Sequence, residues 1–264
     1  MRFKHAVKAV LGLAATLAVA TAVPASAEGT DFAKPINGVK REQGFQAQTT
    51  DGNSFLEVNG AGNLVYWTRS GGSFSGEVRG WGWGGTRIVS SLNSTSFVEV
   101  KGDGRLSKWS WNGGGYVEQV VGWGWGNARL LSAVSSNQFI EINQQGDLAL
   151  WTFDANNVLS KSTIGWGWGG TRVISGLGGT PLDFLEIKGD GRFSEWYDEG
   201  GLKEFPFNDT NFSQVRLLAG TDINHFLLID AVEGGLYEFT LNTSTNQWEP
   251  AQRGWGWGGT RLIG

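Results

Sequence analysis

The sequence predicts an all-β protein, a five-bladed β-propeller of four-stranded antiparallel blades, and three observations lead to this expectation. The tetrapeptide Gly-Trp-Gly-Trp occurs four times in the 264 residues. A set of arginines recurs at steps of about 42 to 45 residues, a period expected of stacked supersecondary units: Arg87, Arg129, Arg172, Arg216 and Arg261. Each interval holds several short apolar runs separated by Gly or Asn, and no helical period appears.

Each repeat reads as four short strands. In the second repeat they fall at residues 87–92, 97–101, 105–111 and 116–123. A phenylalanine opens the second strand of every repeat: Phe55, Phe97, Phe139, Phe184 and Phe226. About a dozen residues later an aromatic lies in the third strand: Trp67, Trp109, Trp151, Trp196 and Phe239. The Gly-rich segments between them are plausible tight hairpin turns, so the strands are antiparallel. A β-solenoid would use shorter rungs.

The chain ends partway through a repeat. Residues 260–264 duplicate the first strand of a blade, and no blade follows them. We expect this strand to complete the blade that begins near Phe55, so that both ends of the propeller lie in one sheet and the ring is closed. The final residues are therefore predicted to be structural.

The N-terminal residues have the pattern of a secretory signal peptide. Positive charges at Arg2, Lys4 and Lys8 precede an apolar run at residues 9–23 and the small-residue site Ala25-Ser26-Ala27. The expected organisation is a signal peptide at 1–27, cleaved after Ala27, then an N-terminal arm at 28–44 and a single propeller domain at 45–264. The mature protein is expected to be secreted. No other long apolar segment exists, so membrane insertion is not expected.

Charge and composition exclude several classes of function. Loss of the leader would change the formal net charge from −4 to about −7, a sign unsuited to binding nucleic acid. Cysteine is absent, so the core and ring closure must hold the fold without disulfides. His225 is the only histidine after the leader, and the Gly-Asp-Gly turns offer one carboxylate each, so neither a zinc nor a calcium site is expected. No cofactor is implied.

Catalysis is not expected. A glycoside hydrolase would need two carboxylates that converge at the central funnel. The strands predicted at the axis, which begin near Arg87, Arg129 and Arg172, contain no Asp or Glu, and Asp222 beyond the fourth such strand is a lone exception. The chain also places like residues in several places rather than unlike residues in one, which favours multivalent binding.

The Gly-Trp-Gly-Trp motif is the main candidate for a binding site. In an extended conformation both indoles would leave one face of the strand, and the glycines would leave the other face bare. An indole offers a flat π surface with an N–H donor, which suits a pyranose ring. The alternative is that the indoles fill the space between blades, and we expect one Trp of each pair to be core. The candidate ligand-binding residues are Trp81, Gly82, Trp83, Trp123, Gly124, Trp125, Trp166, Gly167, Trp168, Trp255, Gly256 and Trp257.

A glutamate also recurs two residues after the repeat phenylalanine, at Glu57, Glu99, Glu141 and Glu186. We expect each to form a buried ion pair with the repeat arginine of the preceding strand. The functional alternative is that arginine and glutamate bind a sugar.

These residues resemble a known family. The order of Gly-x-Gly-Trp, a basic residue four positions later, a Phe-rich strand, and Gly-x-Leu with an aromatic resembles the tachylectin-2 type of five-bladed β-propeller lectin over residues 44–264. It is also similar to bacterial secreted propeller repeats of the FG-GAP kind. The lectin resemblance implies pockets between blades for an N-acetylated hexosamine, at Trp83, Trp125, Trp168 and Trp257 with their flanking glycines. The fourth junction, residues 206–212, has no Trp, so at most four pockets are expected.

Two functions remain open at this point. The leading hypothesis is a secreted, multivalent carbohydrate-binding protein, a lectin, whose partners are glycans or polysaccharides. The alternative is a non-catalytic interaction propeller that binds an extracellular protein partner and whose Trp residues are all core.

Overall fold

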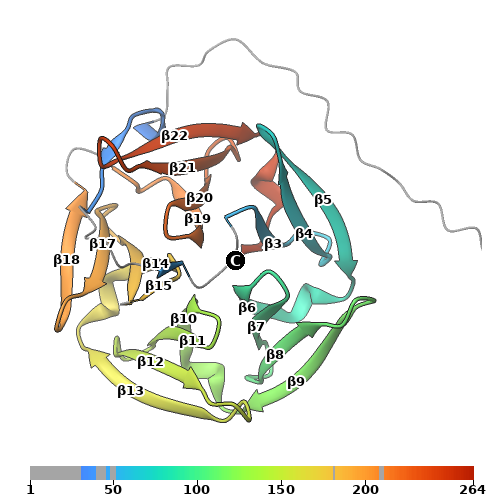
Figure 1. Cartoon of the computed structure of the whole chain (residues 1–264). Coiled ribbons are helices and arrows are strands. Elements are labelled where there is room, and N and C mark those ends of the chain that lie inside the picture. Colours follow the sequence, from blue (N-terminus) through green and yellow to red (C-terminus); the bar gives the residue numbers. More distant parts are fainter. Residues whose placement is uncertain (1–30, 40–45, 48–51, 181, 208–210) are drawn as a thin grey trace, which may run out of the picture.

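The computed structural model describes residues 31–39, 46–47, 52–180, 182–207 and 211–264. They form five antiparallel sheets arranged as blades around a central axis, so the predicted five-bladed β-propeller is confirmed (Figure 1). The predicted leader at 1–27 lies outside the described residues.

Each blade runs from an inner strand near the axis to an outer strand at the rim (Figure 1). Blade I contains β23 (Leu262–Ile263), β3 (Ser54–Val58), β4 (Leu64–Ser70) and β5 (Ser73–Gly80), from the inside outwards. Blade II contains, in the same order, β6 (Thr86–Asn93), β7 (Ser96–Lys101), β8 (Leu106–Trp111) and β9 (Tyr116–Gly122). Blade III contains β10 (Ala128–Ser135), β11 (Gln138–Asn143), β12 (Leu148–Phe153) and β13 (Leu159–Gly165). Blade IV contains β14 (Thr171–Gly176), β16 (Asp183–Lys188), β17 (Phe193–Asp198) and β18 (Leu202–Phe207). Blade V contains β19 (Val215–Asp222), β20 (His225–Asp230), β21 (Leu236–Asn242) and β22 (Gln247–Gly254).

The register of the middle strands explains the spacing of the repeated aromatics. Phe97 on β7 lies opposite Trp109 on β8, and the same cross-strand pairing recurs in every blade. The two rings of this pair are stacked, with centroids 6.1 Å apart. A dozen residues is therefore the length of one hairpin, which returns the chain to the same row of the sheet.

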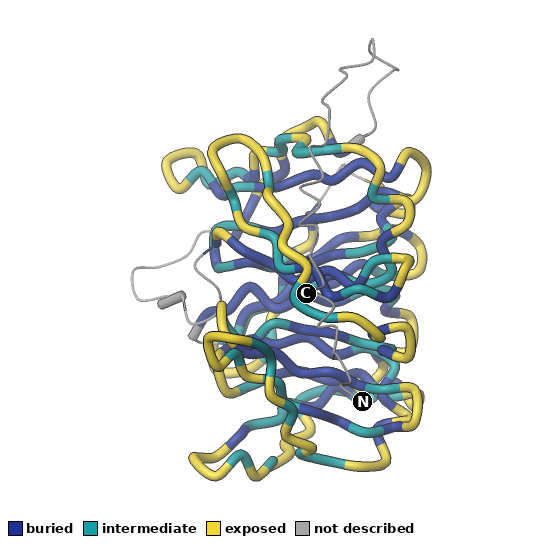
Figure 2. The backbone as a smooth tube through the Cα atoms, turned by 90° about the vertical axis from the view of Figure 1, so that its right-hand side faces the viewer, coloured by how far each residue is buried: buried dark blue, intermediate teal, exposed yellow. Residues whose placement is uncertain are grey.

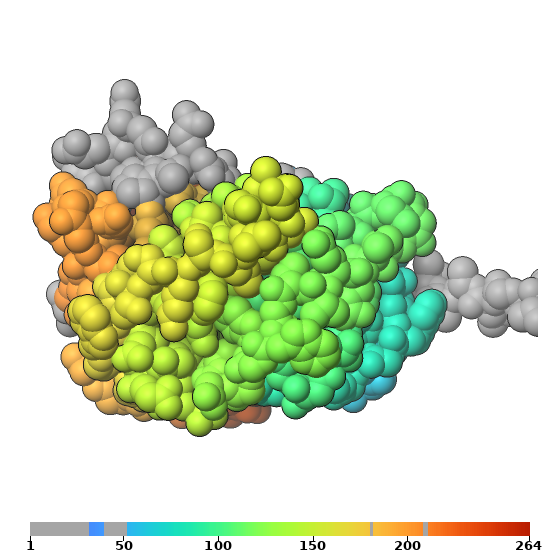
Figure 3. All heavy atoms as spheres, turned by 90° about the horizontal axis from the view of Figure 1, so that it is seen from below, coloured from blue at the N-terminus to red at the C-terminus, as the bar shows by residue number. Residues whose placement is uncertain are grey.

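The apolar core lies between the blades. Buried side chains of neighbouring blades form one cluster at each junction, for example Leu56, Trp83 and Phe97 between blades I and II. In Figure 2 the buried residues lie mainly in strands, while most connecting loops are exposed. The outer strands, such as β5 and β13, are largely exposed as well. Figure 3 shows blade II (green) and blade III (yellow-green) side by side from the outside. Because every blade presents a buried face to both neighbours, no blade has a complete core by itself.

The repeat arginines join one blade to the next. Arg129 at the start of β10 donates from Nη2 to the Trp168 carbonyl at 2.7 Å and from Nη1 to the Thr171 carbonyl, both in the segment that leads into blade IV. The other four repeat arginines bind the equivalent carbonyls. Glu141 accepts instead from Trp151 Nε1 of its own blade at 2.7 Å. The expected Glu–Arg pair is therefore wrong: the arginine reaches across the junction, and the glutamate stays within the blade.

The last strand closes the ring as predicted. In β23, Leu262 pairs with Val58 and Ile263 with Glu57 of β3. Gly264 exchanges two backbone hydrogen bonds with Leu56, at 2.8 and 3.0 Å. Blade I is thus assembled from both ends of the propeller.

The described part of the N-terminal arm lies against blade V. The short strand β1 (Ile36–Asn37) adds to the outer edge of β22, with Ile36 opposite Trp248. Phe32, in the short 3₁₀ turn η1 (Asp31–Ala33), is buried within 5.4 Å of the Phe212 ring, centre to centre. Further along, β2 (Gln46–Ala47) pairs with β15 (Gly179–Thr180) near the axis (Figure 1).

Candidate functional site

The Gly-Trp-Gly-Trp segments are turns, not extended strands. In the copy between blades III and IV, β13 ends at Gly165 and Gly167 adopts a left-handed conformation with φ of 86°. The 3₁₀ turn η4 (Trp168–Gly170) begins at the second Trp. The same geometry occurs at η2 (Trp83–Gly85), η3 (Trp125–Asn127) and η5 (Trp257–Gly259). The left-handed glycine turns the second indole away from the first, so the expectation that both leave one face is wrong.

The second Trp of each motif is part of the core between blades. Trp168 is 8% exposed, and its ring centroid lies 4.6 Å from that of Trp196 and 5.7 Å from that of Phe184. The other second tryptophans make the same contacts with the next blade. The prediction that one Trp of each pair is core is confirmed for Trp83, Trp125 and Trp168, whereas Trp257 is only partly buried against the cluster between blades V and I.

The first Trp of each motif lies on the surface. Trp166 is 75% exposed, and Trp81, Trp123 and Trp255 are exposed as well. Because an exposed indole offers a flat apolar face and an N–H donor, these four residues are the candidates for contact with a ligand.

The two glycines of the motif serve different purposes. A Cβ added at Gly165 would lie 2.6 Å from Trp168 Nε1, so this glycine makes room for the core indole. A Cβ at Gly167 would meet nothing within 4 Å, and there the positive φ is what favours glycine. The missing side chain of Gly165 thus makes room for the Trp168 indole, and not for the backbone of a neighbouring strand.

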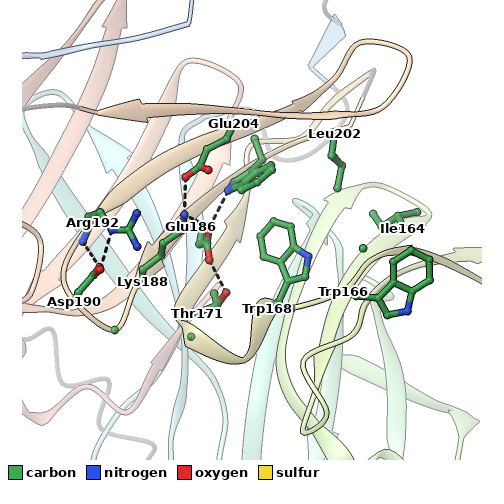
Figure 4. Close-up of a pocket in the computed structure, with 15 residues that line it drawn as sticks. Ile164, Trp166, Trp168, Thr171, Glu186, Lys188, Asp190, Arg192, Leu202 and Glu204 are labelled. Carbon is green, nitrogen blue, oxygen red and sulfur yellow. Dashed lines mark hydrogen bonds and ion pairs between the residues drawn. The ribbon is translucent and has the colours of Figure 1, made fainter.

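A cavity of about 630 Å³ lies beside this turn, between blades III and IV. Trp166 and Trp168 line it from blade III, and the hairpin turn of blade IV that carries Lys188, Asp190 and Arg192 lines it from the other side. Figure 4 shows these polar side chains on one side, Trp166 and Ile164 on the other, and Trp168 between them. The cavity therefore joins an aromatic wall to a charged wall.

The charged wall is a network of paired groups. Lys188 Nζ donates to Glu204 at 2.7 Å and lies 3.9 Å from Glu186. Arg192 Nε donates to Asp190 at 2.8 Å (Figure 4). Glu186 accepts from Thr171 Oγ1 and from Trp196 Nε1. These contacts order the side chains before any ligand arrives.

The pairing also sets the charge state of the wall. Burial opposes ionisation of Glu204, but hydrogen bonds from Lys188 and Ser194 lower the pKa of its carboxyl below the usual value. The hydrogen bond from the Arg192 side chain lowers the pKa of Asp190. Both carboxylates are therefore ionised at neutral pH, where they act only as hydrogen-bond acceptors.

Of the twelve sequence-predicted site residues, only Trp166, Gly167 and Trp168 line this cavity. The sequence interpretation missed its charged wall, although it noticed the Lys-Gly-Asp-Gly turns. The available signal was that, among the Gly-rich hairpin turns, only those at residues 101–104 and 188–191 are followed directly by arginine. At the fourth junction Phe212 takes the structural place of the second Trp, since its carbonyl accepts from Arg172 at 2.7 Å.

The described residues contain no group of three or more His, Cys, Asp or Glu side chains placed to hold a metal ion. Within the same residues, no helix is long and apolar enough to cross a bilayer.

No protein-family model matches this chain, and comparison with curated proteins finds no similar sequence. Among solved structures, the chain is similar to the SapL1 lectin in complex with alpha methyl fucoside, at 13% identity and a TM-score of 0.46, over 81% of this chain and 97% of that one. It is similar to AofleA from Arthrobotrys oligospora at 15% identity and a TM-score of 0.42, over 80% and 74% of the two chains.

It is also similar to yeast RCC1 (Prp20) bound to Kap60, at 9% identity and a TM-score of 0.41 over 70% of this chain. There it spans about half the length of the protein it matches, 54%. At these identities and scores the likenesses carry no information about what this chain binds.

Proposed function

We propose that this protein binds carbohydrate, without catalysis, at the cavity between blades III and IV. The observation that carries the proposal is the position of the exposed Trp166 on a cavity whose other wall is a pre-ordered set of hydrogen-bonding side chains. An indole face can pack on the apolar C–H face of a pyranose, while the charged wall binds its hydroxyls.

The size of the cavity suits such a ligand. Its volume of about 630 Å³ lies within the range of roughly 300 to 1,000 Å³ that small-molecule sites occupy. One or two sugar rings would fill a space of this size.

The charges favour a neutral sugar over an acidic one. Both cations of the wall, Lys188 and Arg192, are paired with carboxylates, and Glu186 adds a further negative charge. A sialylated or sulfated glycan would therefore meet a site with a small negative excess, whereas neutral hydroxyls find both donors and acceptors.

The resemblance to tachylectin-2 lectins favours an N-acetylated hexosamine among the neutral sugars. From the predicted signal peptide we infer that this activity lies outside the cell, where glycans of cell surfaces and polysaccharides are the available partners.

A glycan array probed with the purified protein tests the proposal. We expect binding to neutral glycans, competed by the free monosaccharide, and a loss of at least tenfold in affinity for Trp166→Ala. Val232→Ala, which changes an equally exposed apolar residue on blade V, is the matched control and should bind as the unchanged protein does. Trp168 is not a useful target, because its replacement would test the core.

A blank array with a well-folded protein would contradict carbohydrate binding. The alternative function, an interaction propeller, was expected to have all its tryptophans in the core, and the exposed first tryptophans show that this part of it is wrong. These tryptophans would then mark a surface for an extracellular protein partner, and Trp166→Ala should weaken capture of that partner.

A further inference from the structure

The charged wall of the cavity between blades III and IV has a counterpart at one other junction. Between blades I and II, Lys101 Nζ donates to Glu118 at 2.6 Å and lies 3.9 Å from Glu99, against 2.7 and 3.9 Å for the equivalent contacts of Lys188. Arg105 Nε donates to Asp103 at 2.8 Å, the same distance as in the Arg192–Asp190 pair. Two walls built from separate parts of the chain thus have the same geometry.

The match extends to the groups behind each wall. Ser107 donates to Glu118 at 2.6 Å as Ser194 does to Glu204 at 2.7 Å. Although burial opposes it, the lysine and serine hydrogen bonds lower the pKa of Glu118, as they do for Glu204. The exposed Trp81 holds the same motif position as Trp166.

The two remaining junctions that carry the Trp motif lack this set. Between blades II and III, Asn143 replaces the lysine, and Lys161 lies opposite Trp151 where glutamate stands in the matched pair. Between blades V and I, Asn59 replaces the lysine and Gly76 lies opposite Trp67. Both keep an exposed first Trp, Trp123 and Trp255, but not the charged wall.

We propose that the chain has two sugar sites of the same specificity, between blades I and II and between blades III and IV, and that the Lys–Glu pair of each selects the ligand. This rests on the proposed function. Only two of the four junctions that carry the tryptophan motif are then binding sites. Because the sites are separated by one junction, a single chain can bind two copies of the same glycan on one surface, with a gain in avidity of roughly 10² to 10⁴.

The outer ends of the two sites differ. Ile164 and Leu202 at the III/IV cavity correspond to Arg79 and Tyr116 at the I/II junction, where Arg79 lies 3.7 Å from the centre of the Tyr66 ring. We therefore expect the same sugar at both sites with different affinities.

Native mass spectrometry and calorimetric titration of the full protein measure the number of sites. The first probe is methyl N-acetyl-β-D-glucosaminide, followed by the neutral methyl glycoside that competes best on the array. Two molecules should bind per chain. Lys101→Met and Lys188→Met should each remove one, and Trp81→Ala with Trp166→Ala should lower affinity at least tenfold. Trp255→Ala is the matched control and should leave both sites in place, whereas Trp123 is unsuited because its ring lies 5.8 Å from the Arg105 guanidinium of the I/II wall.

Each other result is decisive. One site or four sites per chain, or a loss from Trp255→Ala equal to that from Trp81→Ala with Trp166→Ala, would overturn the inference of two matched sites and leave carbohydrate binding intact. Failure of the unchanged protein to bind any glycan would overturn the proposed function itself, and this inference with it. Circular dichroism of each variant shows whether a loss of binding is a loss of folding.

Discussion

Two tryptophans of one tetrapeptide have opposite environments, and one glycine between them causes the difference. Gly167 takes a left-handed conformation, so the chain turns, Trp168 enters the core and Trp166 remains in solvent. The sequence could indicate an aromatic pair at each junction, but an extended segment would have put both rings on one face. A glycine that needs positive φ looks, in sequence, the same as one that makes room for a neighbour.

Gly165→Ala should therefore be destabilising. The added methyl would lie 2.6 Å from Trp168 Nε1 and force the core indole to move, at a cost of about 1–3 kcal/mol. Urea denaturation measures the change. Gly169→Ala, in the 3₁₀ turn η4 that follows the motif, adds its methyl to open space and is the matched control. Equal midpoints for the two variants would contradict the close approach.

Glu99 should make stability depend on pH. Burial raises the pKa of its carboxyl above the ordinary 4.5, despite hydrogen bonds from Thr86 and Trp109. The folded state therefore binds the proton more tightly than the unfolded chain, and this contribution to stability is present below about pH 4.5 and is lost as pH rises through the folded pKa.

Glu99→Gln keeps an acceptor for Trp109 and a partner for Thr86 but carries no charge. We expect the variant to have a higher denaturation midpoint than the unchanged protein at pH 7, and a difference that shrinks towards about pH 4. A variant that is less stable than the unchanged protein at neutral pH, by an amount that shrinks in acid, would show that folding favours the ionised form of Glu99.

At the scale of the element, the strand bounds could be predicted closely from the sequence. The contacts of each strand could be predicted within its own blade but not between blades. In blade II the strand bounds expected from the sequence agree with the structure to within two residues. Period-two patterns and hairpin turns are local, so they show which strands pair in sequence order. The partner of Arg129 is not local, because it belongs to a segment about forty residues further along the chain.

Arg129→Met should loosen the contact between blades III and IV. The Trp168 and Thr171 carbonyls would lose their guanidinium donors, with a cost of about 1–3 kcal/mol. Thermal unfolding measures the loss. The melting temperature of Arg129→Lys should lie between those of Arg129→Met and the unchanged protein, since an ammonium group cannot bind two carbonyls with the same fork geometry. Lys203→Met removes an exposed ion pair with Glu199 and is the matched control, which should leave the melting temperature almost unchanged. An unchanged melting temperature for Arg129→Met would mean that these bonds do not hold the blades together.

For the whole molecule, the fold is more predictable than the site. The number of blades and the closing strand follow from counting repeats along one chain. The cavity between blades III and IV combines a turn of one blade with a hairpin and an outer strand of the next, and its charged wall includes Glu204, which no motif marks. Only the assembled ring brings these segments together, so the charged wall could not be predicted from periodicity.

The closing strand lets us test the ring as a unit. Without residues 261–264, blade I would lose the pairing of Leu262 and Ile263 with β3, the backbone bonds of Gly264 to Leu56, and the link from Ser91 Oγ to the Gly264 carbonyl at 2.7 Å. The inner edge of β3 would be exposed, and blades I and II would lose a shared contact at the axis. We expect the truncated protein to melt well below the full chain, whereas Ile263→Val, which removes one buried methyl group, should cost about 1 kcal/mol. Since every blade depends on both neighbours for its core, calorimetry should show one transition at a lower temperature and not the separate melting of blade I. A truncated chain that melts with the full protein would mean that the ring stays closed without its final strand.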